Sequence, residues 1–445
     1  MTGLDPTHRE RTWEWVRRNR FGLFIHWGLY SLAARHEWVR ARERMTGEQY
    51  RRYLERFEPD LYDPAEWAEA AREAGMSYAV LTSKHHEGFC LWPSAAGAYT
   101  VADTPHRTDI VGPFADAFRA AGLGVGLYYS LLDWEHPDFV VDDFHPQRAD
   151  PNALAANAER DPERFRADLH AQIREILSDY GPLEIGFFDF SYPPGYPSAD
   201  DGVIGTGKTR RDWGSEVIYD MARRLQPGMV LNDRLDYLGD FVTPEQYQPS
   251  RPMTVDGEPV PWIACQTING SWGYDRDNSD AKSVNLLLRM LIDTVSKDGG
   301  FLINVGPDGR GRFDPQARAV LAGVGEWMTL HRRAIEGAGP SGFVAPADAR
   351  YTRRGDRLYL HLFSWPFKHV HLAGLGGRIA YAQFLHDASE LSWEVLDPDQ
   401  KANILVPGGE APGTVTLRLP ERRPEVEIPV IEIFLAPDTA EGAPA

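Results

Sequence analysis

Seven short apolar runs, separated by longer stretches with helical patterning, fill the first three quarters of this 445-residue chain. Each run is apolar on both faces, which is typical of buried parallel strands rather than of a sheet that meets water on one side. The runs are Phe21–Trp27, Tyr78–Lys84, Leu123–Ser130, Glu184–Phe190, Met229–Asp233, Trp262–Ile268 and Phe301–Gly306. Strands and helices alternating in this number predict a (β/α)₈-type TIM barrel in which one strand escapes recognition.

The stretches between the runs predict helices that begin and end with recognisable signals. The expected helices are Pro64–Gly75, Pro113–Ala121, Arg160–Tyr180, Trp213–Leu225, Ala281–Lys297 and Asp314–Ile335. Asp63-Pro64 and Asp314-Pro315 each pair an N-cap residue with a proline at the first helical position. A doubly wound sheet is the alternative architecture. The missing GxGxxG motif after the first run favours the barrel.

The pattern changes after about Gly337, where Glu336–Gly342 forms a Gly/Pro linker. The runs that follow are short, alternate with turn residues and predict an antiparallel β-sandwich. They are Arg357–Phe363, Gly413–Leu419 and Glu425–Leu435. We therefore expect a catalytic barrel domain over residues 1–337 and a sandwich domain over 343–437. Residues 438–445 are expected to form a flexible tail.

The charge balance restricts the classes of partner. The chain has 47 Lys and Arg against 65 Asp and Glu, a formal net charge of −18. Such an excess argues against nucleic acid, an anionic membrane surface or a polyanionic substrate. Aromatic residues make up 11% of the chain, which is compatible with stacking on sugar rings as well as with large cores. A neutral or cationic small molecule fits this composition.

The two cysteines, Cys90 and Cys265, lie in apolar stretches and are expected to be buried free thiols. The N-terminal segment lacks the apolar core of a signal peptide. No apolar run reaches the roughly 18 residues of a membrane span. We therefore expect a cytoplasmic protein.

In a TIM barrel, functional side chains lie at the carboxyl ends of the strands. Polar residues follow five of the predicted strands. They are His26-Trp27, Lys84-His85-His86-Glu87, Tyr128-Tyr129, Asp189 and Asn232-Asp233-Arg234.

Asp189 is the most informative of these residues. The period of two places it on the same face as Ile185 and Phe187. The Ser-Tyr-Pro-Pro-Gly segment that follows cannot begin a helix at once, so an N-cap role is disfavoured. Two hypotheses stay open from the residues alone: a catalytic carboxylate, or a buried ion pair with Arg234.

His85 and His86 are candidate metal ligands, but adjacent strand residues point to opposite faces, and no HxH or HExxH motif accompanies them. Recognition of hydroxyl groups by neutral imidazoles suits these two residues better. His26 is compatible with the same role or with a core histidine. We expect neither a metal nor another cofactor.

Six longer motifs occur in order between Arg20 and Ile335. They are RFGLFIHWGLYS (Arg20–Ser31), HEW (His36–Trp38), YAVLTSKHHEGFCLW (Tyr78–Trp92), GLYYSLLDW (Gly126–Trp134), SWGYDRDN (Ser271–Asn278) and SVNLLLRMLIDTVSKDGGFLINVGPDGRG (Ser283–Gly311). These segments resemble the α-L-fucosidases of glycoside hydrolase family 29. The resemblance implies a retaining, metal-independent exo-glycosidase that removes terminal α-L-fucose from glycans or fucosides.

The resemblance also implies catalytic roles. Asp189 corresponds to the nucleophile that forms a covalent fucosyl–enzyme intermediate in a double displacement. A retaining pair of carboxyl groups lies ~5–5.5 Å apart. Glu245, in DFVTPEQ, is the first candidate for the acid/base, and Glu37 and Glu258 are the alternatives because this position varies in the family.

The remaining roles follow from the same resemblance. The residues implied to hold the fucose hydroxyls are His26, Glu37, Trp38, His85, His86 and Tyr129. Arg234 is implied to orient the nucleophile, and Trp272 to pack against the 6-methyl group of the sugar. Two departures, FFDF around Asp189 and the insertion Ser198–Arg211, leave the linkage preference open.

Two other functions remain as alternatives. A retaining α-L-galactosidase would share the mechanism on a substrate with a hydroxyl at C6. A carbohydrate-binding protein could use the same scaffold without catalysis. The expected partner is an oligosaccharide or small fucoside with a terminal α-L-fucose, and a homo-oligomer is also possible.

Overall fold

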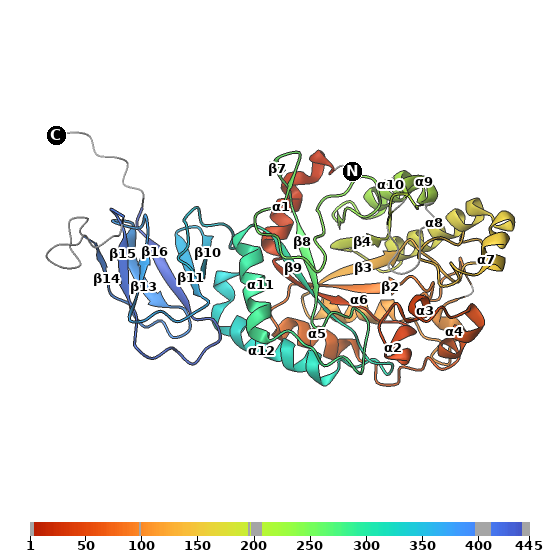
Figure 1. Ribbon diagram of the computed structural model, residues 1–445, viewed down its shortest axis with the longest axis horizontal. Coiled ribbons are helices and arrows are strands. Elements are labelled where there is room, and N and C mark those ends of the chain that lie inside the picture. The colour runs from red at the N-terminus through yellow and green to blue at the C-terminus, as the bar shows by residue number, and fades with distance from the viewer. Residues whose placement is uncertain (1–3, 98, 195, 197–206, 397–410, 438–445) are drawn as a thin grey trace.

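The computed structural model describes residues 4–97, 99–194, 196, 207–396 and 411–437. Most of the Ser198–Arg211 insertion and the whole of the expected tail, 438–445, lie outside these residues. Figure 1 shows a larger α/β part, with helices around a central sheet, and a smaller β part beside α11 and α12.

The central sheet has seven strands in the order β5-β4-β3-β2-β1-β9-β8, and every neighbouring pair is parallel. Its strands are β1 Phe21–Ile25, β2 Tyr78–Lys84, β3 Gly124–Ser130, β4 Ile185–Asp189, β5 Val230–Leu231, β8 Ile263–Thr267 and β9 Gly300–Val305. Each coincides with one of the seven apolar runs. A hairpin of β6 (Thr254–Val255) and β7 (Glu258–Pro259) precedes β8.

Residues 241–245 occupy the gap between the edge strands β5 and β8. Phe241 forms a parallel bridge to Asn232, Val242 to Trp262, and Glu245 to Cys265. This segment closes the barrel where an eighth strand is expected. Pro244, which lies inside it, has no backbone N–H and so cannot complete a regular ladder. The segment is therefore bridged irregularly, and its sequence carries no strand signal.

Helices surround the barrel. They are α1 Arg9–Arg18, α2 Tyr30–Ala33, α3 Val39–Arg42, α4 Gly47–Leu54, α5 Pro64–Glu73, α6 Val111–Ala120, α7 Pro151–Ala155, α8 Pro162–Ser178, α9 Arg210–Trp213, α10 Ser215–Leu225, α11 Val284–Ser296 and α12 Pro315–His331. Short 3₁₀ turns span Pro6–His8, Val101–Asp103, Ala156–Glu159 and Arg332–Ala334. The expected helices correspond to α5, α6, α8, α10, α11 and α12. Both predicted N-caps form, since the side chains of Asp63 and Asp314 accept backbone N–H bonds from the first turns of α5 and α12.

The barrel interior is built by alternate residues of its strands. Phe24, Tyr128, Phe187 and Cys265 belong to one buried cluster inside the sheet. The intervening residues belong to a second cluster shared with the surrounding helices. Asp189 continues the inward-facing row of Ile185 and Phe187, as the period of two predicts, and so lies at the carboxyl end of the barrel.

The C-terminal part is an antiparallel β-sandwich. One sheet has the order β10-β11-β16-β13 and the other β12-β15-β14, and a separate hydrophobic core belongs to this part. The strands are β10 Ala349–Arg354, β11 Arg357–Leu362, β12 His369–Leu372, β13 Ile379–Phe384, β14 Trp393–Val395, β15 Val415–Arg418 and β16 Val430–Leu435. The predicted fold class, a TIM-type barrel followed by a β-sandwich, is confirmed. The domain boundaries 1–337 and 343–437 stay predictions.

The state of the two cysteines and the presence of membrane-spanning helices, both considered in the sequence analysis, can be examined in the described residues. Cys90 and Cys265 are both buried and free. Within the described ranges, no helix combines the length and the apolar character needed to cross a membrane.

Candidate active site

Two adjoining pockets open at the carboxyl end of the barrel. The inner pocket has a volume of about 120 Å³, and the outer pocket has a volume of about 440 Å³. Trp38, Phe190 and Trp272 line both. The candidate residues that line the inner pocket are His26, Trp38, His85, His86, Asp189, Arg234, Glu245 and Trp272. The structure therefore brings together residues from seven separate segments that the sequence predicts to form one site.

Asp189 ends β4 and is held by two donors. The Tyr128 hydroxyl donates to Asp189 Oδ2 at 2.8 Å, and Arg234 Nη1 donates to Oδ1 at 2.9 Å. Both hydrogen bonds fix the carboxylate plane, and the guanidinium compensates its charge in a largely buried position. The next residue, Phe190, has a φ of 86°, a strained value for a side chain of this size. This turn carries the chain sharply away from Asp189 and places the Phe190 ring in the pocket wall.

Arg234 joins two carboxylates through a single nitrogen. Its Nη1 lies 2.9 Å from Asp189 Oδ1 and 2.7 Å from Glu245 Oε2. Burial by itself would lower the pKa of the Arg234 guanidinium. The neighbouring Glu245 and Asp189 outweigh burial and hold this pKa well above its usual value. Because Asp189 Oδ1 and Glu245 Oε2 both contact Arg234 Nη1, these two oxygens cannot lie farther apart than the sum of the 2.9 Å and 2.7 Å distances. That limit agrees with the ~5–5.5 Å of a retaining pair and falls short of the roughly 6.5–9.5 Å of an inverting pair.

The position of Glu245 follows from the irregular closing segment of the barrel. Glu245 is the last bridged residue of 241–245, and Arg234 is also fastened to this segment by a bond from Nε to Thr243 Oγ1 of 2.9 Å. The Glu245 side chain is 38% exposed, against 12% for Asp189. The two carboxylates thus differ in environment, one at the base of the inner pocket and the other at its mouth.

His26 presents a hydrogen-bond acceptor. Asn304 Nδ2 donates to the Trp272 carbonyl at 2.7 Å, which turns Asn304 Oδ1 toward His26 Nδ1 at 2.6 Å. Nδ1 therefore carries the proton, and Nε2 is left as the acceptor for a ligand. Burial, together with the neighbouring His85, lowers the His26 pKa well below its usual value, so the ring is neutral.

His86 is arranged in the same way. Ser130 Oγ donates to the Leu132 carbonyl at 3.0 Å, so the hydroxyl must accept the 2.7 Å hydrogen bond from His86 Nδ1. The proton again occupies Nδ1, and Nε2 accepts. Burial lowers the pKa of His86 well below its usual value. Two neutral imidazoles with free acceptors suit sugar hydroxyl groups, which donate.

His85 lies between the two other histidines and a buried glutamate. Its Nδ1 is 3.5 Å from Glu87 Oε2, and its ring packs 5.3 Å from that of Tyr30. Glu87 is 1% exposed. Neither carboxylate oxygen of Glu87 makes a hydrogen bond within the described residues, and His85 Nδ1 makes none either.

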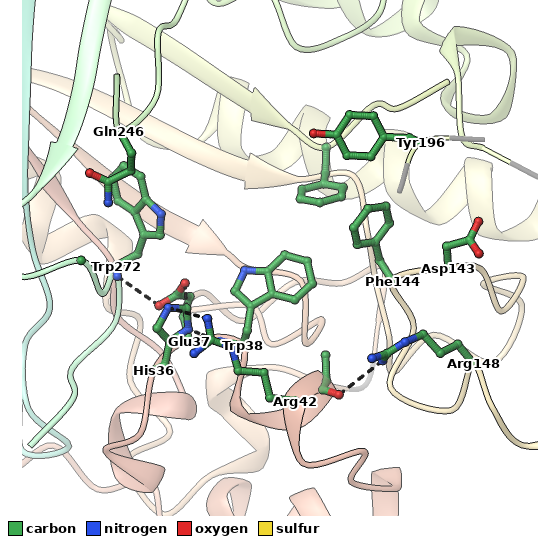
Figure 2. Close-up of a pocket in the computed structure, with 13 residues that line it drawn as sticks. His36, Glu37, Trp38, Arg42, Asp143, Phe144, Arg148, Tyr196, Gln246 and Trp272 are labelled. Atoms are coloured by element: carbon green, nitrogen blue, oxygen red, sulfur yellow. Dashed lines mark hydrogen bonds and ion pairs between the residues drawn. The ribbon is translucent and has the colours of Figure 1, made fainter. Parts of the chain in front are cut away.

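Glu37 lines the outer pocket and is completely buried. Its Oε2 accepts the backbone N–H group of Trp272 at 3.1 Å, and its Oε1 lies 3.1 Å from His36 Nδ1 (Figure 2). Oε2 also accepts the backbone N–H group of Gly273 at 2.8 Å. Burial raises the pKa of the Glu37 carboxyl to about 7, although the Gly273 N–H bond and His85 oppose this rise. Glu37 is thus a third carboxyl group near the inner pocket, and its pKa is close to neutrality.

Aromatic rings form the apolar side of the inner pocket. The Trp272 ring lies 5.0 Å from that of His26 and 5.9 Å from that of Phe24. The Trp38 ring lies 4.9 Å from that of His86. Such faces suit the C–H side of a sugar and an apolar methyl substituent.

Tyr129 does not line this pocket, contrary to the sequence-based expectation. Its hydroxyl donates to Gln172 Oε1 at 2.7 Å and accepts from Lys84 Nζ at 3.1 Å, outside the barrel. Tyr128, the preceding residue, occupies the predicted position because alternate residues of β3 face inward. The inward row passes through Gly124 and Gly126, so the period of two could have identified Tyr128.

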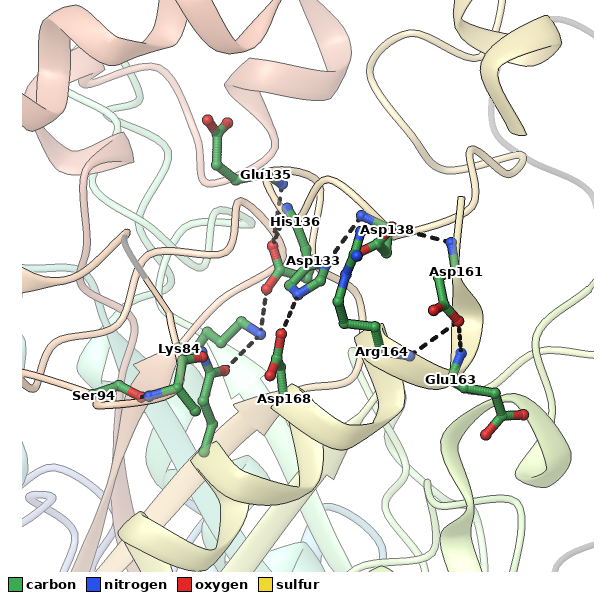
Figure 3. A network of polar contacts seen from close by, with 12 residues as sticks. Lys84, Ser94, Asp133, Glu135, His136, Asp138, Asp161, Glu163, Arg164 and Asp168 are labelled. Carbon is green, nitrogen blue, oxygen red and sulfur yellow. Dashed lines mark hydrogen bonds and ion pairs between the residues drawn. The ribbon is translucent and has the colours of Figure 1, made fainter. Parts of the chain in front are cut away.

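Lys84 and Asp133, two polar residues near strand ends, form a buried structural pair. Lys84 Nζ lies 2.6 Å from Asp133 Oδ2, and Asp133 Oδ1 accepts the backbone N–H groups of Glu135 and His136 (Figure 3). This network fastens the loop after β3 to the back of β2. It lies outside the residues that line the two pockets.

Glu258, the third candidate for the acid/base, lies exposed on the β6–β7 hairpin. Among the described residues, no group of three or more His, Cys, Asp or Glu side chains is placed to hold a metal ion. Asn304, Ser130 and Phe190 were not identified from the sequence, and Tyr128 was named at a strand end but given no role in the site. Only the alternation along β3 pointed to one of them, because the other three act through tertiary contacts.

Carboxylates at the ends of barrel strands, in a pocket whose polar groups are arranged for hydroxyls, define a glycoside hydrolase. The model of the α-L-fucosidase family matches residues 3–333. The chain belongs to the α-L-fucosidase family, glycoside hydrolase family 29.

Individual relatives agree with this membership. The α-L-fucosidase of Branchiostoma floridae is 28% identical over 397 residues, which cover 79% of this chain and 79% of that protein. The structure of α-L-fucosidase isoenzyme 1 from Paenibacillus thiaminolyticus is 37% identical, with a TM-score of 0.87, and the match covers 96% of this chain and 100% of that one. The family 29 α-L-fucosidase structure from Bacteroides thetaiotaomicron is 25% identical, with a TM-score of 0.79 over 98% and 96% of the two chains.

Proposed function

We propose that this protein is a retaining exo-α-L-fucosidase in which Asp189 is the nucleophile and Glu245 the acid/base. The observation that carries the proposal is the shared contact of both carboxylates with Arg234 Nη1, at 2.9 and 2.7 Å. It supports a separation of the two groups suited to a double displacement. A solved bacterial fucosidase, 25% identical, is described with a monovalent iminocyclitol inhibitor, which supports a fucoside as substrate.

In the first step, an Asp189 oxygen attacks C1 of the fucose while Glu245 gives its proton to the leaving oxygen. The C1–O bond breaks, and a covalent fucosyl–Asp189 ester forms. In the second step, Glu245 takes a proton from water, and the water oxygen displaces Asp189 from C1. His26 and His86 accept hydrogen bonds from the sugar hydroxyls, and Trp272 faces the 6-methyl group.

The stereochemistry of azide trapping separates the two roles. Asp189→Ala should lower kcat on an aryl α-L-fucoside by about a thousandfold or more, because no ester can form. Azide should then occupy the vacated space and give the β-configured fucosyl azide. Glu245→Ala should retain ester formation on the same substrate, and azide should release the α-configured product.

Glu258→Gln is the matched control, because it removes an exposed carboxylate outside both pockets. It should leave kcat/KM unchanged. Full activity of Asp189→Ala would contradict the assignment of the nucleophile. Formation of α-configured azide by Glu37→Ala rather than by Glu245→Ala would move the acid/base role to Glu37. Faster turnover of an α-L-galactoside than of the fucoside would change the substrate.

A further inference from the structure

A third pocket opens at the amino end of the barrel strands, at the other end of the barrel from the two pockets described above. Its volume is about 680 Å³. Phe21, which begins β1, lines it together with Ser77 and Leu123, which precede β2 and β3. Arg354, the last residue of β10, lines it from the sandwich. The pocket therefore lies where the barrel meets the sandwich.

Arginine side chains dominate the lining of this junction pocket. Six arginines and only one acidic residue line it, although the whole chain has 65 acidic residues against 47 Lys and Arg. The local charge is thus opposite in sign to that of the chain. The lining arginines are Arg17, Arg18, Arg20, Arg72, Arg332 and Arg354, and the acidic residue is Glu336.

One carboxylate beside the pocket is shared by two of these arginines. Asp298 Oδ2 lies 2.8 Å from Arg17 Nη2, and Asp298 Oδ1 lies 2.5 Å from Arg20 Nη2. Arg20 is buried, whereas the Arg17 side chain is 47% exposed. A single negative charge therefore faces two guanidinium groups on this side of the pocket.

Glu336 is shared in the same way on the side next to the sandwich. Its Oε1 lies 3.3 Å from Arg332 Nε, and its backbone carbonyl accepts from Arg354 Nη1 at 3.4 Å. Burial raises the pKa of the Glu336 carboxyl, although Arg332 and Arg354 oppose this rise. Glu336 therefore cannot balance the charge of both arginines.

Arg18 adds a positive charge that has no partner within the described residues. It lies in the last turn of α1, and its side chain is exposed. Arg72, in contrast, donates from Nε to Glu69 Oε2 at 2.9 Å. The six guanidinium groups and the three carboxylates that face them leave an excess of three positive charges.

The helix ends at this pocket do not remove the excess. The carboxyl ends of α1, α5 and α6 lie beside it, and arginines in a last turn commonly interact with such ends. Each end contributes about half of a negative elementary charge. Three ends therefore offset only about half of the remaining positive charge.

We propose that the junction pocket binds a small anion with two or more negative charges, which contacts Arg18 from the barrel and Arg354 from the sandwich. Guanidinium groups bind phosphate and carboxylate oxygens in pairs, so either kind of oxyanion has the required chemistry. The volume lies within the roughly 300–1,000 Å³ of pockets for small organic ligands, and so leaves room for more than one charged group. The bound anion joins the two parts of the molecule.

Titration calorimetry with pyrophosphate and with citrate tests the proposal, at about 150 mM NaCl to screen long-range attraction. Wild type should bind one equivalent saturably, and the probe that binds more tightly identifies the oxyanion as phosphate or carboxylate. Arg18→Gln and Arg354→Gln should each weaken binding about tenfold, because each removes a charge-assisted contact. Both replace exposed side chains, so without the anion they should unfold at the wild-type temperature.

Arg418→Gln is the matched control, because Arg418 is a 64% exposed side chain of β15 in the sandwich. It should bind both probes as wild type does, and so should Asp189→Ala, which changes only the other end of the barrel. Absence of saturable binding to wild type would overturn the proposal. So would unchanged affinity in Arg18→Gln and Arg354→Gln, or an equal loss in Arg418→Gln. Loss of binding in Asp189→Ala would place the anion at the active site and would also overturn it.

Discussion

Glu37 combines complete burial with hydrogen bonds that favour its charge. Its carboxyl is 0% exposed, and two backbone N–H groups donate to one oxygen. The groups that face it are His36 beside it, Arg42 on α3, His85 after β2 and the Tyr30 hydroxyl on α2. His36 adds no positive charge, because burial lowers its pKa to about 3. Desolvation therefore dominates, and the pKa of Glu37 rises to about 7.

The raised pKa makes stability depend on pH. A carboxyl whose pKa is higher in the folded state stabilises the protein fully below its unfolded pKa, near 4.5. This contribution is lost as the pH rises through about 7. Glu37→Gln stays neutral, so the free energy of unfolding of wild type should fall relative to that of the variant between about pH 4.5 and pH 7. Above pH 7 the difference should stay constant at up to about 3 kcal/mol.

Thermal unfolding of ligand-free protein across this pH range measures the difference. Glu258→Gln, which replaces an exposed carboxylate, should follow the wild-type curve. A constant difference between Glu37→Gln and wild type at all pH values would show that Glu37 does not titrate in this range.

Individual residues show where sequence reasoning ends. The period of two placed Asp189 inside the barrel, and the structure agrees, because alternation depends only on the backbone of the strand. The same rule applied to β3 selects Tyr128, whereas the motif resemblance selected Tyr129. Asn304 and Ser130 could not be found, because their roles depend on which atoms of other segments lie beside them.

The N-cap of α5, Asp63, is a local interaction of one helix, and its contribution to the free energy of unfolding can be measured. Asp63 Oδ1 accepts from Ala65 N at 3.0 Å and Glu66 N at 3.2 Å. Asp63→Ala removes this acceptor, and with it both hydrogen bonds, and should lower the free energy of unfolding by about 1 kcal/mol. Asp63→Asn keeps an acceptor at the N-cap and should lose much less.

Chemical denaturation measures these changes, and kcat/KM should not change in either variant because α5 lies outside both pockets. Equal destabilisation by Ala and Asn would indicate that charge rather than hydrogen bonding is responsible. No destabilisation by Asp63→Ala would show that water replaces the cap at no cost.

Elements were predictable where local patterns are strong. The seven apolar runs and the six long helices follow from hydrophobic periodicity and from the Asp-Pro starts. The segment 241–245 was not recognised as barrel-forming, because Pro244 interrupts it and its bridges come from β5 and β8. Glu245 owes its place to that segment, so the position of the candidate acid could only be ranked from the sequence.

For the whole molecule, the contact between barrel and sandwich is both apolar and ionic. Tyr359, Leu385, Ile428 and Val430 of the sandwich belong to the hydrophobic cluster of the barrel and its helices. Trp327 Nε1 of α12 donates to the Ile428 carbonyl at 3.0 Å. The sequence indicated a linker near this point but not the extent of the contact, because the apolar residues involved are spread over the sandwich strands.

Asp293 of α11 is the ionic centre of this contact. Its Oδ1 accepts from Arg350 Nε of β10 at 2.8 Å, and its Oδ2 lies 2.5 Å from Lys297 Nζ and accepts from Gln248. Burial raises the Asp293 pKa, but hydrogen bonds from Lys297, Gln248 and Arg350 outweigh it and lower the pKa below its usual value. The carboxylate therefore stabilises the protein above its unfolded pKa, and this contribution is lost as the pH falls through the lower folded pKa.

Asp293→Asn should lower the free energy of unfolding by about 2 kcal/mol at neutral pH, because Arg350 and Lys297 lose their counter-charge at a partly buried contact. The difference from wild type should shrink as the pH falls below about 4, where wild type also becomes neutral at this position. Asp356→Asn removes an exposed partner of Arg357 and should cost less than about 0.5 kcal/mol. Thermal and denaturant unfolding across pH measure both variants. A pH-independent loss in Asp293→Asn would mean that packing, and not the carboxylate charge, joins the barrel to the sandwich at this point.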